Sequence, residues 1–419
     1  MKKFMIMALC LCAATGAFAQ EQVLKDADRA LKQEAPDYAS VSKSLRTIMG
    51  DPNAANDVRT WYLAGKAGTG QYSTGYQALT LGQPVDRKAM SRALVDGFRF
   101  YLRALPLDTV IETKGDKVKV KTKYSKDIVK SIAEHYNDYY TAGAILYEEK
   151  DFSGAYEAWD VYTSIPFMTQ LGKLKPEVPA DSIMAENLYN MGMFAYSAEM
   201  YPEATDAFLR ATEFNYPGCD AFNNAIACAG MAGDQDRKFE IAKLAYAHRG
   251  SENPGYIGEI INGYIDRKQN DQAIEWLDKA IADTPENAQL YNAKGILIES
   301  SIPEDADAAT VEAGNEKALV FYKKAVELEP EGAMWNFHYG RMLANKGYRL
   351  SDASADLPTA EYNKMREEQI LPLFKDAAVY LEKAIAVDPD ATRNALPILR
   401  NIYYNLGDAD NMKRIEDLQ

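Results

Sequence analysis

The chain repeats one thirteen-residue pattern, as AIEWLDKAIADTP (273–285), ALVFYKKAVELEP (318–330) and AAVYLEKAIAVDP (377–389). Each copy starts with alanine, has a second alanine seven residues later and a proline five residues after that, with large apolar residues at helical spacing between them. Two small residues a heptad apart let one helix press closely against its neighbour, and proline closes the unit because it cannot continue a helix. One supersecondary unit, a helical pair, is therefore repeated, and such pairs bury their apolar faces by stacking on one another.

The intervals between copies show where the repeats are interrupted. Ala204 and Ala273 lie 69 residues apart, which is two units of about 34 residues plus one. The intervals from Ala155 to Ala204, from Ala273 to Ala318 and from Ala318 to Ala377 are 49, 45 and 59 residues, so each exceeds one unit. The excess falls in segments that lack the repeat pattern, at about 169–182, 299–315 and 347–374.

This pattern resembles the tetratricopeptide repeat, whose helical pair has a small residue in its first helix, two alanines and an aromatic residue in its second, and a closing proline. One copy has Gly295, Ala318, Tyr322, Ala325 and Pro330 at these places. Other copies are marked by Gly192, Ala204, Phe208 and Ala211, and by Gly143, Ala155 and Trp159. The resemblance implies an all-α fold, a right-handed superhelical solenoid of tetratricopeptide-like helix pairs.

The N-terminus has the features of a secretory signal peptide. Lys2 and Lys3 precede an apolar run, and Ala17 and Ala19 supply the small residues that signal peptidase needs before Gln20. The alternative is a lipoprotein signal, although leucine precedes both cysteines of the apolar run. No later stretch reaches about 18 apolar residues, so we expect no transmembrane span. The expected location is the periplasm or the cell envelope, after cleavage behind Ala19.

One segment departs from helical periodicity. The residues after Gly115 alternate lysine with valine, which predicts a small β-hairpin inserted at 109–126. Six lysines lie between Lys114 and Lys126 in an otherwise acidic chain. They either dock to an anionic partner or lipid headgroup, or keep an exposed strand edge from aggregating. Along the chain we therefore expect a signal peptide at 1–19, degenerate N-terminal repeats at 20–108, the Lys-rich hairpin insertion at 109–126 and tetratricopeptide-like repeats at 127–419.

The composition argues against nucleic acid and against catalysis. Removing residues 1–19 takes away two of the 47 basic residues, which leaves 45 against 61 acidic residues, a net charge of −16. A chain this acidic is a poor partner for nucleic acid. His135, His248 and His338 lie far apart in sequence, and no nucleophile, acid–base or metal constellation is recognisable. We therefore expect no enzyme, no catalytic residue, no metal and no cofactor.

In proteins with this repeat, the first helix of each pair lines a concave groove, and the resemblance carries that role to particular residues. The expected partner-binding groove consists of Tyr140, Tyr147, Tyr189, Met193, Tyr196, Asn262, Asn292, Phe337 and Arg341. It is aromatic in its N-terminal half and mixed polar after that. The alternative is that these tyrosines pack against the core and the insertions.

Two short segments resemble the Asp, Ser or Thr, then aliphatic sequon of an O-glycosylation system found in some exported bacterial proteins. They are Asp108-Thr109-Val110 and Asp181-Ser182-Ile183. Both fall in expected insertions, where a bulky glycan would be tolerated. Thr109 and Ser182 are therefore candidate O-glycosylation sites.

The expected function is a non-catalytic repeat scaffold in the periplasm or cell envelope that binds a protein or peptide segment in its groove. The alternative is a glycan-binding or glycan-handling envelope protein, because tyrosine and asparagine side chains stack on sugars and hydrogen-bond to them. A glycan array separates the two.

The processing hypothesis gives a first prediction. We expect the exported protein to begin at Gln20 and to carry no lipid, because Ala17 and Ala19 satisfy signal peptidase. The intact mass of the exported protein measures this directly. A mass that requires a diacylglycerol-modified cysteine at the N-terminus would contradict the prediction and indicate a membrane anchor.

Overall fold

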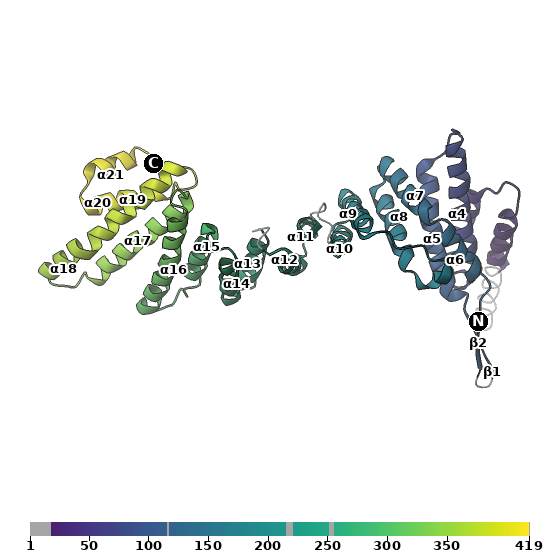
Figure 1. The fold of residues 1–419 in the computed structure, drawn as a ribbon, viewed down its shortest axis with the longest axis horizontal. Helices are drawn as coiled ribbons and strands as arrows, with labels where there is room; N and C mark the ends of the chain where they lie inside the picture. Colours follow the sequence, from purple (N-terminus) through teal and green to yellow (C-terminus); the bar gives the residue numbers. More distant parts are fainter. Residues whose placement is uncertain (1–17, 115–116, 215–220, 251–254, 419) are drawn as a thin grey trace, which may run out of the picture. The chain divides into compact units, whose positions relative to one another are not determined.

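The computed structural model describes residues 18–114, 117–214, 221–250 and 255–418 (Figure 1). The chain divides into two compact units, here called the N-terminal unit (Met1–Asp234) and the C-terminal unit (Gln235–Gln419). Both consist of consecutive helices that pack as pairs. The prediction of an all-α arrangement of tetratricopeptide-like pairs with one small β-hairpin is confirmed.

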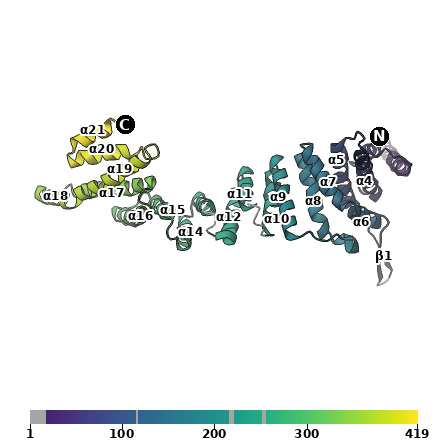
Figure 2. The same cartoon turned by 45° about the horizontal axis from the view of Figure 1, so that its top comes forward.

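The N-terminal unit begins with a helical segment at 18–30. Then follow α2 (Tyr38–Arg46), α3 (Pro52–Ala55), α4 (Val58–Thr80), α5 (Arg87–Leu107), β1 (Val110–Lys114), β2 (Lys117–Lys121), α6 (Ser125–Glu134), α7 (Tyr136–Glu148), α8 (Phe152–Ser164), η1 (Ile165–Phe167), η2 (Thr169–Leu174), α9 (Asp181–Ser197), α10 (Tyr201–Thr212) and α11 (Ala221–Met231). Adjacent helices of the unit pack in order, as Figure 2 shows from a second direction.

The described secondary structure of the C-terminal unit is all helical, with turns between the helices. It contains α12 (Gln235–Arg249), α13 (Gly255–Asp266), α14 (Asn270–Asp283), α15 (Ala288–Ser300), α16 (Ala308–Leu328), α17 (Ala333–Ala353), α18 (Thr359–Met365), η4 (Arg366–Ile370), α19 (Leu371–Val387), α20 (Ala395–Leu406) and α21 (Ala409–Glu416). Within the described part of the chain, no helix combines the length and the apolarity that crossing a bilayer requires.

Local chemistry sets the ends of many of these helices. Asp86 and Asp307 cap α5 and α16, because each carboxylate accepts a hydrogen bond from a backbone N–H of the first turn, at 2.8 and 2.7 Å. Lys150, Glu199 and Lys268 have left-handed φ angles of 56–58° just after α7, α9 and α13. The same tight turn therefore closes the first helix of three pairs, and in each of them the second helix begins four residues after the first one ends.

An aromatic side chain of the second helix, packed against a glycine of the first, fixes the distance between the two helices of a pair. A Cβ atom on Gly143 would lie 2.0 Å from Trp159, and one on Gly192 would lie 2.7 Å from Phe208. Real Cβ atoms essentially never approach other heavy atoms that closely. The aromatic residue of the second helix therefore rests on the bare backbone of the first, as the repeat pattern implies.

The same contact occurs in the degenerate pair and in the pair with a long insertion. In α4 and α5, a Cβ on Gly65 would lie 2.3 Å from the Tyr101 ring. In α15 and α16, a Cβ on Gly295 would lie 2.7 Å from the Tyr322 ring. Extra residues between the glycine and its aromatic partner therefore leave the contact between the two helices unchanged.

The segments expected as insertions at 299–315 and 347–374 are largely helical. Gly340 of α17 faces Leu381 of α19, and Gly347 faces Phe374, so the contact recurs seven residues later on one helix and seven residues earlier on the other. This is the register of an antiparallel helical hairpin. The residues at 347–374 therefore extend both helices of one pair, with α18 and the π-helical η4 continuing directly into α19. By contrast, residues 169–174 form short 3₁₀ turns that are broken at Gly172, where φ is +51°.

The predicted hairpin at 109–126 is present as an antiparallel pair of strands that projects from the helices (Figure 1). Ile111 pairs with Val120, and both side chains are exposed. Gly115 and Asp116, between the two strands, lie outside the described residues.

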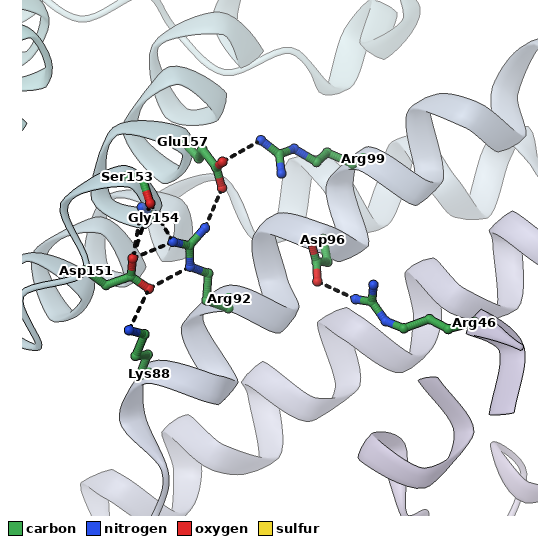
Figure 3. A network of polar contacts seen from close by, with 9 residues as sticks. All are labelled: Arg46, Lys88, Arg92, Asp96, Arg99, Asp151, Ser153, Gly154 and Glu157. Carbon is green, nitrogen blue, oxygen red and sulfur yellow. Dashed lines mark hydrogen bonds and ion pairs between the residues drawn. The ribbon is translucent and has the colours of Figure 1, made fainter. Parts of the chain in front are cut away.

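A polar network joins the degenerate pair to the regular repeats (Figure 3). Arg92 of α5 donates to Asp151 at 2.6 Å and to Glu157 of α8 at 2.7 Å. Lys88 lies 3.5 Å from Asp151, and Arg99 lies 3.1 Å from Glu157. Asp151 also caps α8, and its side chain is only 7% exposed. Three cations of α5 therefore neutralise carboxylates at the start of α8.

Replacing Arg92 with alanine tests this junction. Asp151 would stay buried but lose its strongest donors, so we expect the free energy of unfolding at pH 7 to fall by about 1–3 kcal/mol. Arg29 is an exposed arginine that pairs with Asp26 at 3.4 Å, and Arg29→Ala serves as the control, with an expected change below about 0.5 kcal/mol. Equal urea midpoints for the two variants would contradict the assignment.

The same variant has a predicted pH dependence. Burial raises the pKa of Asp151, but the hydrogen bonds and charge of Arg92, together with the Gly154 N–H and Lys88, lower it below the usual range of an aspartate. A depressed pKa in the folded state adds stability above the unfolded pKa, and that stability is lost as the pH falls through the folded pKa. The difference between the wild type and Arg92→Ala should therefore be large at pH 7 and shrink below about pH 4. Urea titrations at both pH values measure it.

Candidate functional site

A continuous series of aromatic rings runs through α7, α8 and α9. Neighbouring rings lie 4.7–5.7 Å apart between centroids. We call this series the aromatic ladder, and it consists of Tyr136, Tyr140, Tyr147, Phe152, Trp159, Tyr162 and Phe194. Its rings come from two consecutive helical pairs, so the ladder depends on how the pairs stack.

Two buried rings hold the ladder together. Trp159 stacks on Tyr140 at 4.8 Å and meets Phe194 of the next pair edge-on at 5.0 Å. Phe194 in turn lies 4.9 Å from Tyr147. The Trp159 indole N–H also donates to the Tyr140 carbonyl oxygen at 3.1 Å. Tyr140 and Tyr147 are therefore held in place from behind by packed aromatic residues.

The front of the ladder is open to solvent. Tyr140 and Tyr147 are 42% and 49% exposed, and Met193 and Tyr196 on α9 are 39% and 40% exposed. Tyr140 and Tyr147 are seven residues apart and share one face of α7, as Met193 and Tyr196 share one face of α9. Four of the five groove residues expected in the N-terminal half thus present large side chains to solvent.

Tyr189 differs from the other four. It is half-buried, its ring lies edge-on to Phe208 at 5.4 Å, and its hydroxyl accepts a hydrogen bond from Asn224 of α11 at 3.0 Å. The ring and the hydroxyl of Tyr189 therefore both make contacts within the unit, and they connect α9 to α10 and α11.

In the C-terminal unit, the expected groove residues lie in different surroundings. Asn262 is exposed and lines a hollow of about 420 Å³ between α12 and α13. The walls carry charge pairs, including Lys238 with Glu259 at 2.5 Å. Asn292 is only 6% exposed, and its Oδ1 has no hydrogen-bond partner within the described residues. Its amide is therefore withdrawn from the surface.

Arg341 is occupied by a carboxylate of its own chain. Its guanidinium donates two hydrogen bonds to Glu299, at 2.7 and 2.6 Å, and the Tyr322 hydroxyl donates to the same carboxylate at 2.8 Å. Burial opposes ionisation of Glu299, but the Arg341 hydrogen bonds prevail and lower its pKa. His338 stacks on Tyr322, and burial lowers its pKa to about 4. Half-buried Phe337 packs beside His338.

The two sequon-like segments differ in accessibility. Thr109 is exposed, but Asp108 before it is 4% exposed and accepts hydrogen bonds from the backbone N–H groups after β2. Asp181, Ser182 and Ile183 are all exposed at the start of α9. A modifying enzyme that contacts all three side chains could therefore reach the segment at Ser182 but not the segment at Thr109, because Asp108 is buried in the folded protein.

One serine–histidine contact was not foreseen from the sequence, because the two residues lie far apart along the chain. Ser73 Oγ lies 3.1 Å from His135 Nε2, and His135 Nδ1 lies 2.8 Å from the Ser131 carbonyl oxygen. Ser73 is inside α4, where the neighbouring backbone N–H groups bond within the helix and cannot form an oxyanion hole. Among the described residues, no group of three or more His, Cys, Asp or Glu side chains could hold a metal ion.

The known proteins that this chain resembles are solved structures, and those named below cover about half of it. No protein-family model matches the chain, and no curated protein matches it. Solved structures similar to it include YrrB, described as a TPR protein with an unusual peptide-binding site, at 16% identity and a TM-score of 0.31, covering 49% of this chain and 87% of that one. Others are residues 41 to the end of MamA from Desulfovibrio magneticus (16%, 0.31, 49% and 95%) and a thermophilic TPR protein of Thermus thermophilus (15%, 0.28, 55% and 87%). No functional conclusion follows from likenesses of this size.

Proposed function

We propose that the chain is a non-catalytic scaffold that holds a segment of a partner protein against the exposed edge of the aromatic ladder. The observation that carries the proposal is the contrast between the front and the back of the ladder. Tyr140 and Tyr147 are about half exposed, while Trp159 and Phe194 behind them are 5% and 9% exposed.

This arrangement suits partner binding for energetic reasons. A tyrosine that is already packed against rigid rings loses little side-chain entropy when a partner covers it. Its ring removes apolar area from water, and its hydroxyl can still hydrogen-bond. Preformed aromatic anchors of this kind typically supply most of the binding free energy at an interface. Met193, exposed on α9, can add an adaptable apolar contact.

The proposed location is the periplasm or the cell envelope. It is supported by the basic start, the apolar run and the small residues before Gln20. Residues 1–17 lie outside the described part of the chain.

A glycan is the second candidate ligand for the same surface. The exposed faces of Tyr140 and Tyr147 are suited to stacking on sugar rings, and their hydroxyl groups can bond to sugar hydroxyls. The two candidates make different demands, because an extended peptide needs Met193 and Tyr196 as well, whereas one sugar covers a single tyrosine. A glycan array probed with the full chain would distinguish them.

The binding proposal is tested with substitutions on the ladder. A photoreactive phenylalanine analogue at position 147 captures the partner in intact cells, and mass spectrometry identifies the crosslinked segment, which is then synthesised. We expect Tyr147→Ala to weaken binding of that segment by about 1–2 kcal/mol, or about 5–30-fold, in fluorescence anisotropy. Tyr404 is 75% exposed in the other unit, so Tyr404→Ala is the matched control. Equal affinities of the two variants would rule out the ladder as the binding surface.

Tyr189→Ala should behave differently from Tyr147→Ala. Because Tyr189 packs on Phe208 and accepts from Asn224, its loss should lower the melting temperature of the protein, with a cost of about 2 kcal/mol or more. Thermal unfolding followed by circular dichroism measures this. A melting temperature equal to that of the wild type would show that Tyr189 belongs to the open surface instead.

A further inference from the structure

A second surface hollow lies in the N-terminal unit at the base of the β-hairpin. It has a volume of about 430 Å³ and is enclosed by the helical segment 18–30 with Lys32, by α4, and by residues 123–124 directly after β2. It shares no residue with the aromatic ladder. Its lining includes five cations: Lys25, Lys32, Arg59, Lys66 and Lys123. This concentration of positive charge is unusual in a chain with a net charge of −14.

Three of the five cations are neutralised within the chain. Lys32 pairs with Asp28 of the lining at 2.6 Å, and Lys25 pairs with Glu21 at 3.4 Å. Arg59 lies between Glu21, at 2.8 Å, and Asp57, at 2.6 Å. These pairs leave no surplus charge of their own to attract a ligand.

Lys66 and Lys123 are the exceptions. Both are exposed, and neither forms an ion pair with a described residue. Each ammonium group lies over a tyrosine ring instead, 5.6 Å from the centroid of Tyr62 and 4.9 Å from that of Tyr124. The hollow therefore contains two positive charges without a carboxylate partner.

The rings of Tyr62 and Tyr124 form an aromatic platform next to these lysines. Their rings lie 4.3 Å apart with an interplanar angle of 30°. The Tyr62 hydroxyl donates to the Asp127 carboxylate, which fixes one side of the platform. A ligand that enters the hollow can thus place an anionic group beside the ammonium groups and an apolar or ring portion against the tyrosines.

Asp108 holds the third wall of the hollow in place. Its buried carboxylate accepts hydrogen bonds from the backbone N–H groups of Lys123, Tyr124 and Ser125, at 3.0, 2.8 and 2.6 Å, and from the Ser125 hydroxyl at 2.6 Å. These bonds close the base of the hairpin. Lys123 and Tyr124 are therefore positioned before any ligand binds, which reduces the entropy lost on binding.

We propose that this hollow binds the phosphate group of an anionic ligand through Lys66 and Lys123. A phosphate monoester carries a charge of about −1.5 to −2 at pH 7, which matches two uncompensated ammonium groups. Lysine is a common phosphate ligand in proteins because it acts as a strong point charge. The phosphate belongs either to a small soluble molecule or to a lipid headgroup, and the ligand's remaining atoms lie against the platform of Tyr62 and Tyr124.

The test uses the full chain and defined probes. Glucose 6-phosphate, glucose and inorganic phosphate are titrated by calorimetry, and vesicles of phosphatidylcholine with or without phosphatidic acid are used in co-sedimentation. The double variant Lys66→Gln/Lys123→Gln removes the two unpaired charges. Lys43→Gln/Lys324→Gln is the control, because both of its lysines are exposed, lie outside the hollow and change the net charge equally.

We expect a phosphate-bearing probe to bind the wild type and the control alike, and the Lys66→Gln/Lys123→Gln variant at least about tenfold more weakly. Binding of glucose 6-phosphate identifies a soluble ligand, whereas binding only to vesicles with phosphatidic acid identifies a lipid headgroup. The proposal is overturned if no phosphate-bearing probe binds the wild type, or if the double variant and the control lose affinity equally. Circular dichroism verifies that each variant is folded.

Discussion

An aromatic side chain resting on a glycine of the preceding helix is the contact on which the rest of this structure depends. Because glycine has no side chain, the ring approaches the backbone itself, and the helix separation is set by one ring thickness. Trp159 shows why this matters beyond the fold. The same indole that lies against Gly143 also stacks on Tyr140 and meets Phe194 of the next pair. The contact that defines one helical pair therefore also supports the exposed tyrosines proposed to bind a partner.

This contact also explains how the chain tolerates long insertions. Tyr322 rests on Gly295 and Phe374 rests on Gly347, although more residues separate these partners than separate Gly192 from Phe208. The added residues either lengthen the two antiparallel helices beyond the contact or form the connection between them. The packing of the two helices against each other is therefore preserved. Stability in such a chain comes mainly from contacts within pairs and between neighbouring pairs. Polar contacts such as those of Arg92 then join the degenerate pair of α4 and α5 to the regular repeats.

Much of the fold could be predicted from the sequence because its determinants are local. Alanine spacing, glycine and aromatic positions and the closing proline identify the helical pairs, and alternating lysine and valine identify the hairpin. The site could be predicted only in part. Tyr140 and Tyr189 occupy comparable positions in the pattern, yet Asn224 of a later helix engages Tyr189. Arg341 was expected in an open groove, but Glu299 binds it from α15. Such outcomes depend on residues that are distant in sequence, and the repeat pattern does not specify them. The hollow near Lys66 has the same origin, since three separate segments form it.

Substitution of glycine by alanine at two positions of one unit tests the central claim most directly. Gly295 and Gly258 both lie in helices of the C-terminal unit, but a Cβ at Gly295 would lie 2.7 Å from Tyr322, whereas a Cβ at Gly258 would meet nothing within 4 Å. The account predicts that Gly295→Ala lowers the free energy of unfolding by about 1–3 kcal/mol through overpacking. Gly258→Ala should raise it by about 0.5–1 kcal/mol through helix propensity. Denaturant titrations that show both variants to be equally stable, or both stabilised, would contradict the account.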